Sequence, residues 1–249
     1  MKIVILTALI VGGATVFGAA IGLLFRRTSV RFNNGAMSFA AGVMLAAAVI
    51  GLILPSLEYG GRFPVFVTVI GILVGAFCLD FFDQVILRRV GTRKPAIGDN
   101  TDERMRRVVL FVTAIAIHNL PEGIASGVGF GTDDPSSGIF IATAIALQNI
   151  PEGMTVSVAM LGVGIKPSRA FLVAALTGVV EIFGTFIGYF AVSISSAVLP
   201  FILAFAGGNM LYVIADEMIP EVHSDEGDHL STYLLLGGFC FMLLLNAIL

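Results

Sequence analysis

Long apolar stretches separated by short polar segments follow one another along the whole chain of 249 residues. A helix needs about 20 mostly apolar residues to cross the ~30 Å hydrocarbon layer of a membrane. Eight stretches reach this length. The pattern predicts one transmembrane helix over each of residues 3–25, 34–57, 65–87, 108–130, 137–161, 169–191, 198–219 and 230–248.

Composition agrees with this pattern. Hydrophobic residues make up 57% of the chain and charged residues only 12%, whereas a soluble domain carries about 25% charged residues. We therefore predict an all-α integral membrane protein that forms a single domain over residues 1–249. The apolar stretch from Ile3 to Phe25 exceeds the ~7–15 residues of a signal-peptide core, so it is interpreted as a retained first helix. Cys78 and Cys240 lie far apart in apolar runs and form no metal or disulfide motif.

Basic residues predict how the helices are oriented. Twelve of the fourteen fall in the segments after the first, third and fifth predicted helices: Arg26, Arg27, Arg31, Arg88, Arg89, Arg93, Lys94, Arg104, Arg106, Arg107, Lys166 and Arg169. Cytoplasmic loops carry the excess of lysine and arginine. Both termini are therefore expected outside, with residues 88–107 as a cytoplasmic loop.

Two similar phrases place polar residues in the middle of predicted helices. "AIAIHNLPEGIASGVGF" begins at residue 114, and "AIALQNIPEGMTVSVAM" begins at residue 144. The first carries His118, Asn119 and Glu122, and the second carries Gln148, Asn149 and Glu152. Spacings of three and four residues place each set on one helix face. At ~1.5 Å rise per residue, both sets lie near the bilayer midplane, as do Glu181 and Met44.

Charged groups at this depth need compensation. A charge at the bilayer centre costs at least ~2.5–3.5 kcal/mol, and ionisable residues there are functional candidates by default. A bound divalent cation would turn mutually repelling carboxylates into ligands around one positive centre. Pro121 and Pro151 also leave the carbonyls of Ile117 and Leu147 without helical donors. The alternative is that these polar residues only join helices by hydrogen bonds.

The two phrases lie on helices of opposite direction, so they form an inverted pair. A second, weaker pair consists of "AGVMLAAAVIGLILP", from residue 41, and "AGGNMLYVIADEMIP", from residue 206. Inverted repeats with polar sites at the midplane are typical of secondary transporters.

The paired H-N-x-P-E-G and Q-N-x-P-E-G motifs, together with V-E in "TGVVEIFG", resemble the ZIP (Zrt-, Irt-like protein) metal transporters of the bacterial type, over the whole chain. The resemblance implies uptake of divalent metal, chiefly Zn²⁺, into the cytoplasm through a two-metal site. Carried over by position, His118, Glu122, Glu152 and Met44 would hold the primary ion. Asn119, Asn149 and Glu181 would complete a second site bridged by Glu122 and Glu152, with Gln148 peripheral.

The resemblance also implies an elevator-like movement, a homodimer and a multi-pass location in a cell membrane, here a bacterial inner membrane, surrounded by lipid. No organic cofactor and no nucleic-acid partner are expected. The loop over residues 88–107 lacks the histidines of many members, and Gln148 stands where some relatives have histidine. An oxygen-rich site with one imidazole also suits Cd²⁺, Fe²⁺, Mn²⁺ or Co²⁺.

Acidic residues and histidines near the predicted cytoplasmic face allow two interpretations: ordinary charges at helix ends and in a solvated loop, or a path that receives the released metal. They are Asp80, Asp83, Asp216, Glu217, His223 and His229.

Two other functions remain as alternatives. A metal-dependent membrane hydrolase would need a general base beside an activated water, and the chain has no H-E-x-x-H motif; an enzyme is not expected. A membrane metal sensor is the second alternative, against which the inverted repeat argues.

Overall fold

The computed structural model describes residues 1–24, 30–91, 100–131, 135–194, 196–222 and 229–248, and every element within these ranges is helical. Eight helices are long and apolar enough to cross a membrane, which confirms the predicted number. In chain order the elements are α1 (Lys2–Leu24), α2 (Val30–Ala46), η1 (Ala47–Ile53), α3 (Leu54–Tyr59), α4 (Pro64–Gly91), α5 (Asn100–Val128), η2 (Gly129–Gly131), α6 (Pro135–Gly162), α7 (Pro167–Ile194), η3 (Ser196–Val198), α8 (Leu199–Val213), η4 (Ile214–Met218), α9 (Ile219–Val222) and α10 (His229–Ile248).

The predicted loop over residues 88–107 is shorter in the structure. Helix α4 continues to Gly91 and α5 begins at Asn100, so both helices extend into the segment. Helices α5 and α6 also run unbroken through Pro121 and Pro151.

The second and seventh transmembrane helices contain matching π-helical segments. In η1 the N–H of Leu54 donates to the carbonyl of Val49, and in η4 the N–H of Ile219 donates to the carbonyl of Ile214. Each donor immediately precedes a proline, Pro55 or Pro220, which has no N–H to offer. The same backbone deviation at equivalent positions supports the second inverted pair, which the sequence indicated only weakly.

Helices α1, α5, α6 and α7 form one tightly packed unit, here called the four-helix group. The most extensive contacts within it join α1 to α6 and α7, and α5 to α7. Glycines make these contacts close. A side chain at Gly123 would clash with the carbonyl of Glu181, and one at Gly153 would clash with the carbonyl of Thr15. The glycine of each P-E-G motif therefore fixes its helix directly against a neighbouring backbone.

The remaining helices form a second unit, the flanking group, which consists of α2 with η1 and α3, α4, α8 with η4 and α9, and α10. Its most extensive contacts join α4 to α8 and α2 to α10. Gly75 packs against the carbonyl of Phe205, and Gly238 against that of Phe39. Between the two groups, the nearest neighbours of Gly51 in η1 are the side chains of Phe140 and Ile141 in α6.

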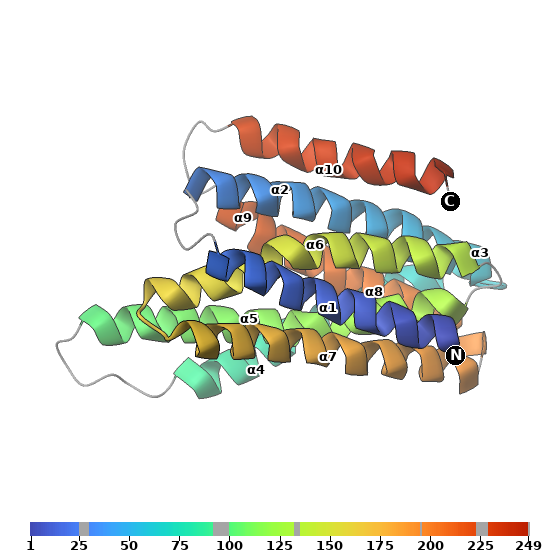
Figure 1. The fold of residues 1–249 in the computed structure, drawn as a ribbon. Coiled ribbons are helices and arrows are strands. Elements are labelled where there is room, and N and C mark those ends of the chain that lie inside the picture. The colour runs from blue at the N-terminus through green and yellow to red at the C-terminus, as the bar shows by residue number, and fades with distance from the viewer. Residues whose placement is uncertain (25–29, 92–99, 132–134, 195, 223–228, 249) are drawn as a thin grey trace.

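Both termini lie at the same end of the bundle (Figure 1). The opposite end holds the last turn of α1, the starts of α2 and α5, and α9. Large apolar side chains on the outer faces of α4 and α10, including Phe66, Phe77 and Leu244, are exposed. Such faces suit contact with lipid chains rather than water.

Candidate metal site

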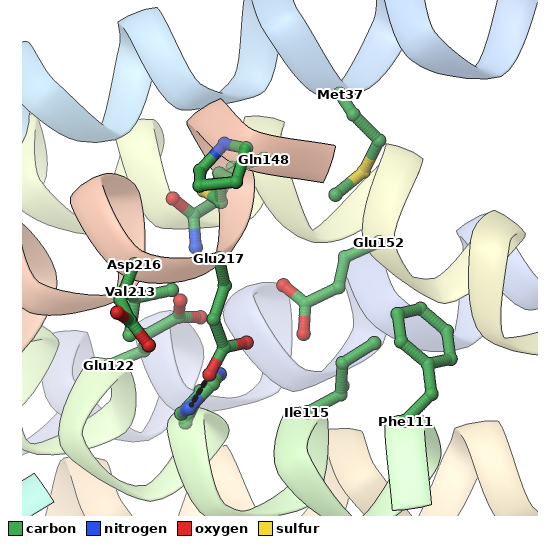
Figure 2. A pocket seen from close by; sticks show the side chains of 12 residues that line it. Met37, Phe111, Ile115, Glu122, Gln148, Glu152, Val213, Asp216 and Glu217 are labelled. Carbon is green, nitrogen blue, oxygen red and sulfur yellow. Dashed lines mark ion pairs between the residues drawn. The ribbon is translucent and has the colours of Figure 1, made fainter. Parts of the chain in front are cut away.

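A pocket of ≈ 360 Å³ lies where α5 and α6 of the four-helix group face α2 and η4 of the flanking group. Its lining residues are Met37, Phe111, Ile115, His118, Glu122, Gln148, Glu152, Val213, Asp216, Glu217, Met218 and Pro220. Figure 2 shows Glu122, Gln148, Glu152 and Glu217 converging on this pocket. The structure thus brings together four of the predicted ligands, His118, Glu122, Gln148 and Glu152.

Buried oxygen acceptors without a donor gather on the two motif helices. Within the described part of the chain, five side-chain oxygens of this kind belong to the predicted ligands: Asn119 Oδ1, Glu122 Oε2, Gln148 Oε1, Asn149 Oδ1 and Glu152 Oε1. A buried acceptor that lacks a partner costs about 1–3 kcal/mol. Carboxylate and amide oxygens are also ligands that divalent cations accept. These five oxygens therefore suit the binding of a cation better than a purely structural role in hydrogen bonds between helices.

Glu181 is fully buried and lies outside the pocket lining. Asn119 Nδ2 donates to its Oε1 at 2.6 Å, and Asn149 Nδ2 donates to its Oε2 at 2.5 Å. Thr15 on α1 donates its hydroxyl to Oε1 at 2.9 Å. Both carboxylate oxygens are therefore occupied by protein donors, in contrast to the unpaired oxygens of Glu122 and Glu152.

His118 faces the flanking group. Its Nε2 lies 3.3 Å from Asp83 Oδ2 on α4 and 3.1 Å from Glu217 Oε1 on η4. One ligand atom from each of these three residues lies within 4.8 Å of the others. Asp83 and Glu217, which the sequence placed only near the cytoplasmic face, therefore meet the histidine of the predicted metal site.

Other predicted site residues lie elsewhere. Met44 is buried in the apolar core beside Val43 and Leu52, and the pocket takes its methionine on α2 from Met37. Asp80 accepts hydrogen bonds from Tyr212 and Gln84.

The other residues of the predicted release path lie in different places. Asp216 lines the pocket and also accepts a hydrogen bond from Tyr212. His229 is exposed at the start of α10. His223 lies outside the described residues.

Sequence reasoning missed Thr15 and Met37. No motif marks Thr15, whose importance comes only from the contact with Glu181. Met37 lies seven residues before Met44, so both occupy similar positions around α2 about two turns apart. The spacing can be recognised in the sequence, but which methionine lines the pocket depends on how the four-helix group packs against α2, which no local pattern encodes.

Comparison with known proteins agrees with the motifs. The family described as ZIP zinc transporter matches residues 88–246. The chain is 34% identical to zinc transporter GufA of Myxococcus xanthus, over 97% of each chain. It is 36% identical to zinc transporter ZIPB of Bordetella bronchiseptica, over 94% of this chain and 77% of the relative, and 30% identical to zinc transporter ZIP11 of Homo sapiens, over 94% and 93%. The chain is a multi-pass membrane protein and belongs to the ZIP family of transporters.

Proposed function

We propose that the protein carries Zn²⁺ across the membrane into the cytoplasm through a binuclear site at the midplane. The observation that supports this most strongly is the set of five unpaired buried oxygens on α5 and α6. The relatives named as zinc transporters point to the same cargo. Zinc accepts imidazole nitrogen and carboxylate oxygen together, while the oxygen-rich set leaves room for Cd²⁺, Fe²⁺, Mn²⁺ and Co²⁺.

The first ion would be held by His118, Glu122 and Glu152, with Gln148 beside them. The second would take the oxygens of Asn119 and Asn149, with Glu122 and Glu152 bridging the two positions. Glu181 would complete this second position through Oε2, because that oxygen accepts one hydrogen bond, from Asn149, and keeps a second lone pair. A coordination shell that these side chains fill only in part suits an ion that has to be released again.

Release would use the contact between His118 and the flanking group. Asp83 and Glu217 contact the imidazole from the flanking group and supply carboxylate oxygens from α4 and η4. An ion leaving Glu122 and Glu152 could pass to these oxygens while it stays bound to the same histidine. Each step then exchanges one ligand for another and avoids a bare ion in the membrane interior.

The position of the pocket along the bundle supports release into the cytoplasm. Met37 in the first half of α2 and Phe111 in the first half of α5 line it, with Pro220 of α9 just after η4, and so the pocket extends toward the end of the bundle where α2 and α5 begin. This is the end that the basic residues assign to the cytoplasm. Movement of the four-helix group along the flanking group, in an elevator-like manner, would expose the site to the other side.

Metal flux tests the proposal. Purified protein is reconstituted in vesicles that contain a zinc-sensitive dye, and the wild type is compared with Glu152→Ala and His118→Ala. We expect uptake by the wild type and its loss in both variants, with thermal unfolding close to the wild type. If the dye signal does not change with Zn²⁺, Cd²⁺, Mn²⁺ or Fe²⁺, the result would contradict transport and favour a metal sensor. A hydrolysis assay on the same preparation checks the enzyme alternative.

A further inference from the structure

We propose that Ser126 on α5 forms, together with Glu122, an entry site for the divalent cation on the outer side of the two-metal site. The inference rests on the proposed function, because it names a further ligand on the path of the same ion. Its starting point is the hydroxyl of Ser126, which is fully buried. Among the buried side-chain atoms of the described residues that lack a hydrogen-bond partner, Ser126 Oγ is the one hydroxyl oxygen.

Within the part of the chain that the structure describes, the missing partner of Ser126 is unusual for a serine in a helix. Such a hydroxyl commonly donates to the carbonyl three or four residues earlier, as those of Thr143 and Ser193 do here. Ser157 on α6 is fully buried like Ser126 and donates to the carbonyl of Met154 at 3.0 Å. Burial of a hydroxyl without any hydrogen bond costs about 1–3 kcal/mol. A cation bound to the lone pairs of Oγ would offset this cost.

Ser126 continues the row of predicted ligands along α5. His118, Glu122 and Ser126 follow one another at intervals of four residues, so they lie on one face of the helix about 6 Å apart along its axis. Two donors four residues apart on a helix can hold one metal ion between them, as the paired histidines of helical zinc motifs do. Glu122 Oε2 is also buried and has no donor among the described residues. Glu122 can therefore share one ion with His118 and another with Ser126.

The inverted repeat places this hydroxyl on one side of the predicted metal site. Helix α5 begins at the end of the bundle that the basic residues assign to the cytoplasm, and α6 begins at the opposite end, which holds both termini (Figure 1). Ser126 thus lies beyond Glu122 toward the outside, while its counterpart in the second phrase, Val156, lies beyond Glu152 toward the cytoplasm. Val156 is fully buried and offers no oxygen. On that side, the oxygen ligands come from the flanking group instead.

An apolar side chain closes the next turn toward the outside. A Cβ at Gly129 would lie 2.7 Å from Ile141 Cδ1, and one at Gly51 would lie 2.6 Å from Ile141 Cγ1. The fully buried Ile141 therefore contacts the end of α5 and the flanking group at once. An ion from outside would reach Ser126 after the contact between Ile141 and Gly51 has opened. It would then pass along α5 by exchange of one ligand at each step.

A cysteine substitution tests the entry site without relying on transport. In a background in which Cys78 and Cys240 are replaced by alanine, detergent-purified Ser126→Cys is titrated with Cd²⁺, and the ultraviolet absorption of the cadmium–thiolate bond is recorded. We expect this absorption to appear, and to require about tenfold more Cd²⁺ when Glu122→Gln is added, because the two side chains share the ion. Ser157→Cys is the matched control and should show no absorption at the same Cd²⁺ concentrations. No absorption in Ser126→Cys, or an unchanged Cd²⁺ requirement with Glu122→Gln, would overturn the inference.

Uptake into vesicles tests the role of this site in transport and remains informative if Ser126→Cys does not fold. We expect Ser126→Ala to raise the external Zn²⁺ concentration at half-maximal rate about tenfold, the loss expected for one contact to a charged group, while the maximal rate changes less than about twofold. Its unfolding temperature should match the wild type, because the removed hydroxyl has no hydrogen-bond partner among the described residues. Ser157→Ala should leave the half-maximal concentration unchanged.

The two experiments separate failure of the entry site from failure of transport. An unchanged half-maximal concentration in Ser126→Ala, in vesicles where the wild type takes up Zn²⁺, would overturn the inference and leave transport standing. Absence of uptake by the wild type would count against the proposed function, and the cadmium–thiolate absorption would then decide whether Ser126 and Glu122 bind a cation together.

Discussion

Two acidic residues near the pocket, Asp83 and Glu217, contact His118, and they should govern release more than capture. We predict that Glu217→Gln lowers the maximal rate of Zn²⁺ uptake about tenfold, since a charge-assisted hydrogen bond of ~1.5 kcal/mol or more is lost. The external Zn²⁺ concentration at half-maximal rate should change little. Initial rates in vesicles measure both quantities. Asp80→Asn is the control, because Asp80 accepts its hydrogen bonds from Tyr212 and Gln84. An equal decrease of the maximal uptake rate in Asp80→Asn would refute a specific role for Glu217.

The thioether of Met37 is the soft donor that α2 brings to the pocket lining. We predict that Met37→Leu, which nearly preserves volume, lowers Cd²⁺ uptake relative to Mn²⁺ uptake at least about twofold, because thioether sulfur favours softer metals. Competition of the two ions in the same vesicles gives the ratio. Met44→Leu is the matched control in the apolar core. An unchanged ratio in Met37→Leu would mean that Met37 serves only as an apolar wall.

Single residues differ in how far the sequence could place them. Glu122 and Glu152 were predictable because a carboxylate that recurs in the middle of an apolar helix is too costly to keep without a function. Thr15 was not, since a threonine in a helix commonly bonds to its own backbone four residues earlier. The sequence placed Asp83 and Glu217 only late in their helices, because their contact with His118 depends on the packing of α4 and η4 against α5, which no local pattern encodes.

At the scale of elements, glycines set the distances within the four-helix group. A Cβ at Gly12 would clash with the carbonyl of Gly178 and lie 2.8 Å from Ile182 Cγ1, whereas one at Gly13 meets nothing within 4 Å. We predict that Gly12→Ala destabilises the protein by about 1–3 kcal/mol through overpacking. Gly13→Ala should be neutral or slightly stabilising. Unfolding of both variants in detergent checks the difference, and equal stabilities would contradict the tight α1–α7 contact.

The helices themselves were predictable because apolar length alone specifies a membrane span. Their internal irregularities were not. Pro55 and Pro220 indicate a missing donor, yet a helix can respond with a kink, a broken turn or a π segment. The structure shows π segments at both positions. In η4 this segment carries Asp216 and Glu217, and Glu217 is the one that contacts His118.

At the scale of the whole molecule, the two groups differ in how they are joined. Inside each group glycines bring backbones into contact, whereas Gly51 of the flanking group meets side chains of α6. Interdigitated side chains can exchange neighbours more readily than backbones fixed at glycines. The predicted ligands on α5 and α6 belong to one group, while Met37, Asp83 and Glu217 belong to the other. Sliding between the groups would therefore change which flanking residues face the ions.

A covalent link between the groups should stop this movement. In a background in which Cys78 and Cys240 are replaced by alanine, we predict that Gly51→Cys with Ile141→Cys abolishes Zn²⁺ uptake after treatment with a membrane-permeant oxidant, and that a reductant restores it. A Cβ at Gly51 would lie 2.6 Å from Ile141 Cγ1, which places the two Cβ atoms within reach of a disulfide.

The matched control joins Gly207→Cys to Ile53→Cys, where a Cβ at Gly207 would lie 2.9 Å from Ile53 Cγ1. Both residues of this pair belong to the flanking group, and Ile53 lies in the same π segment as Gly51, so oxidation should leave uptake near that of the reduced protein. The extent of cross-linking is measured by mass spectrometry on the same vesicles. Full uptake by the Gly51–Ile141 variant at complete cross-linking would contradict movement of the groups, because an ion would then cross the membrane while η1 and α6 stay fixed to each other.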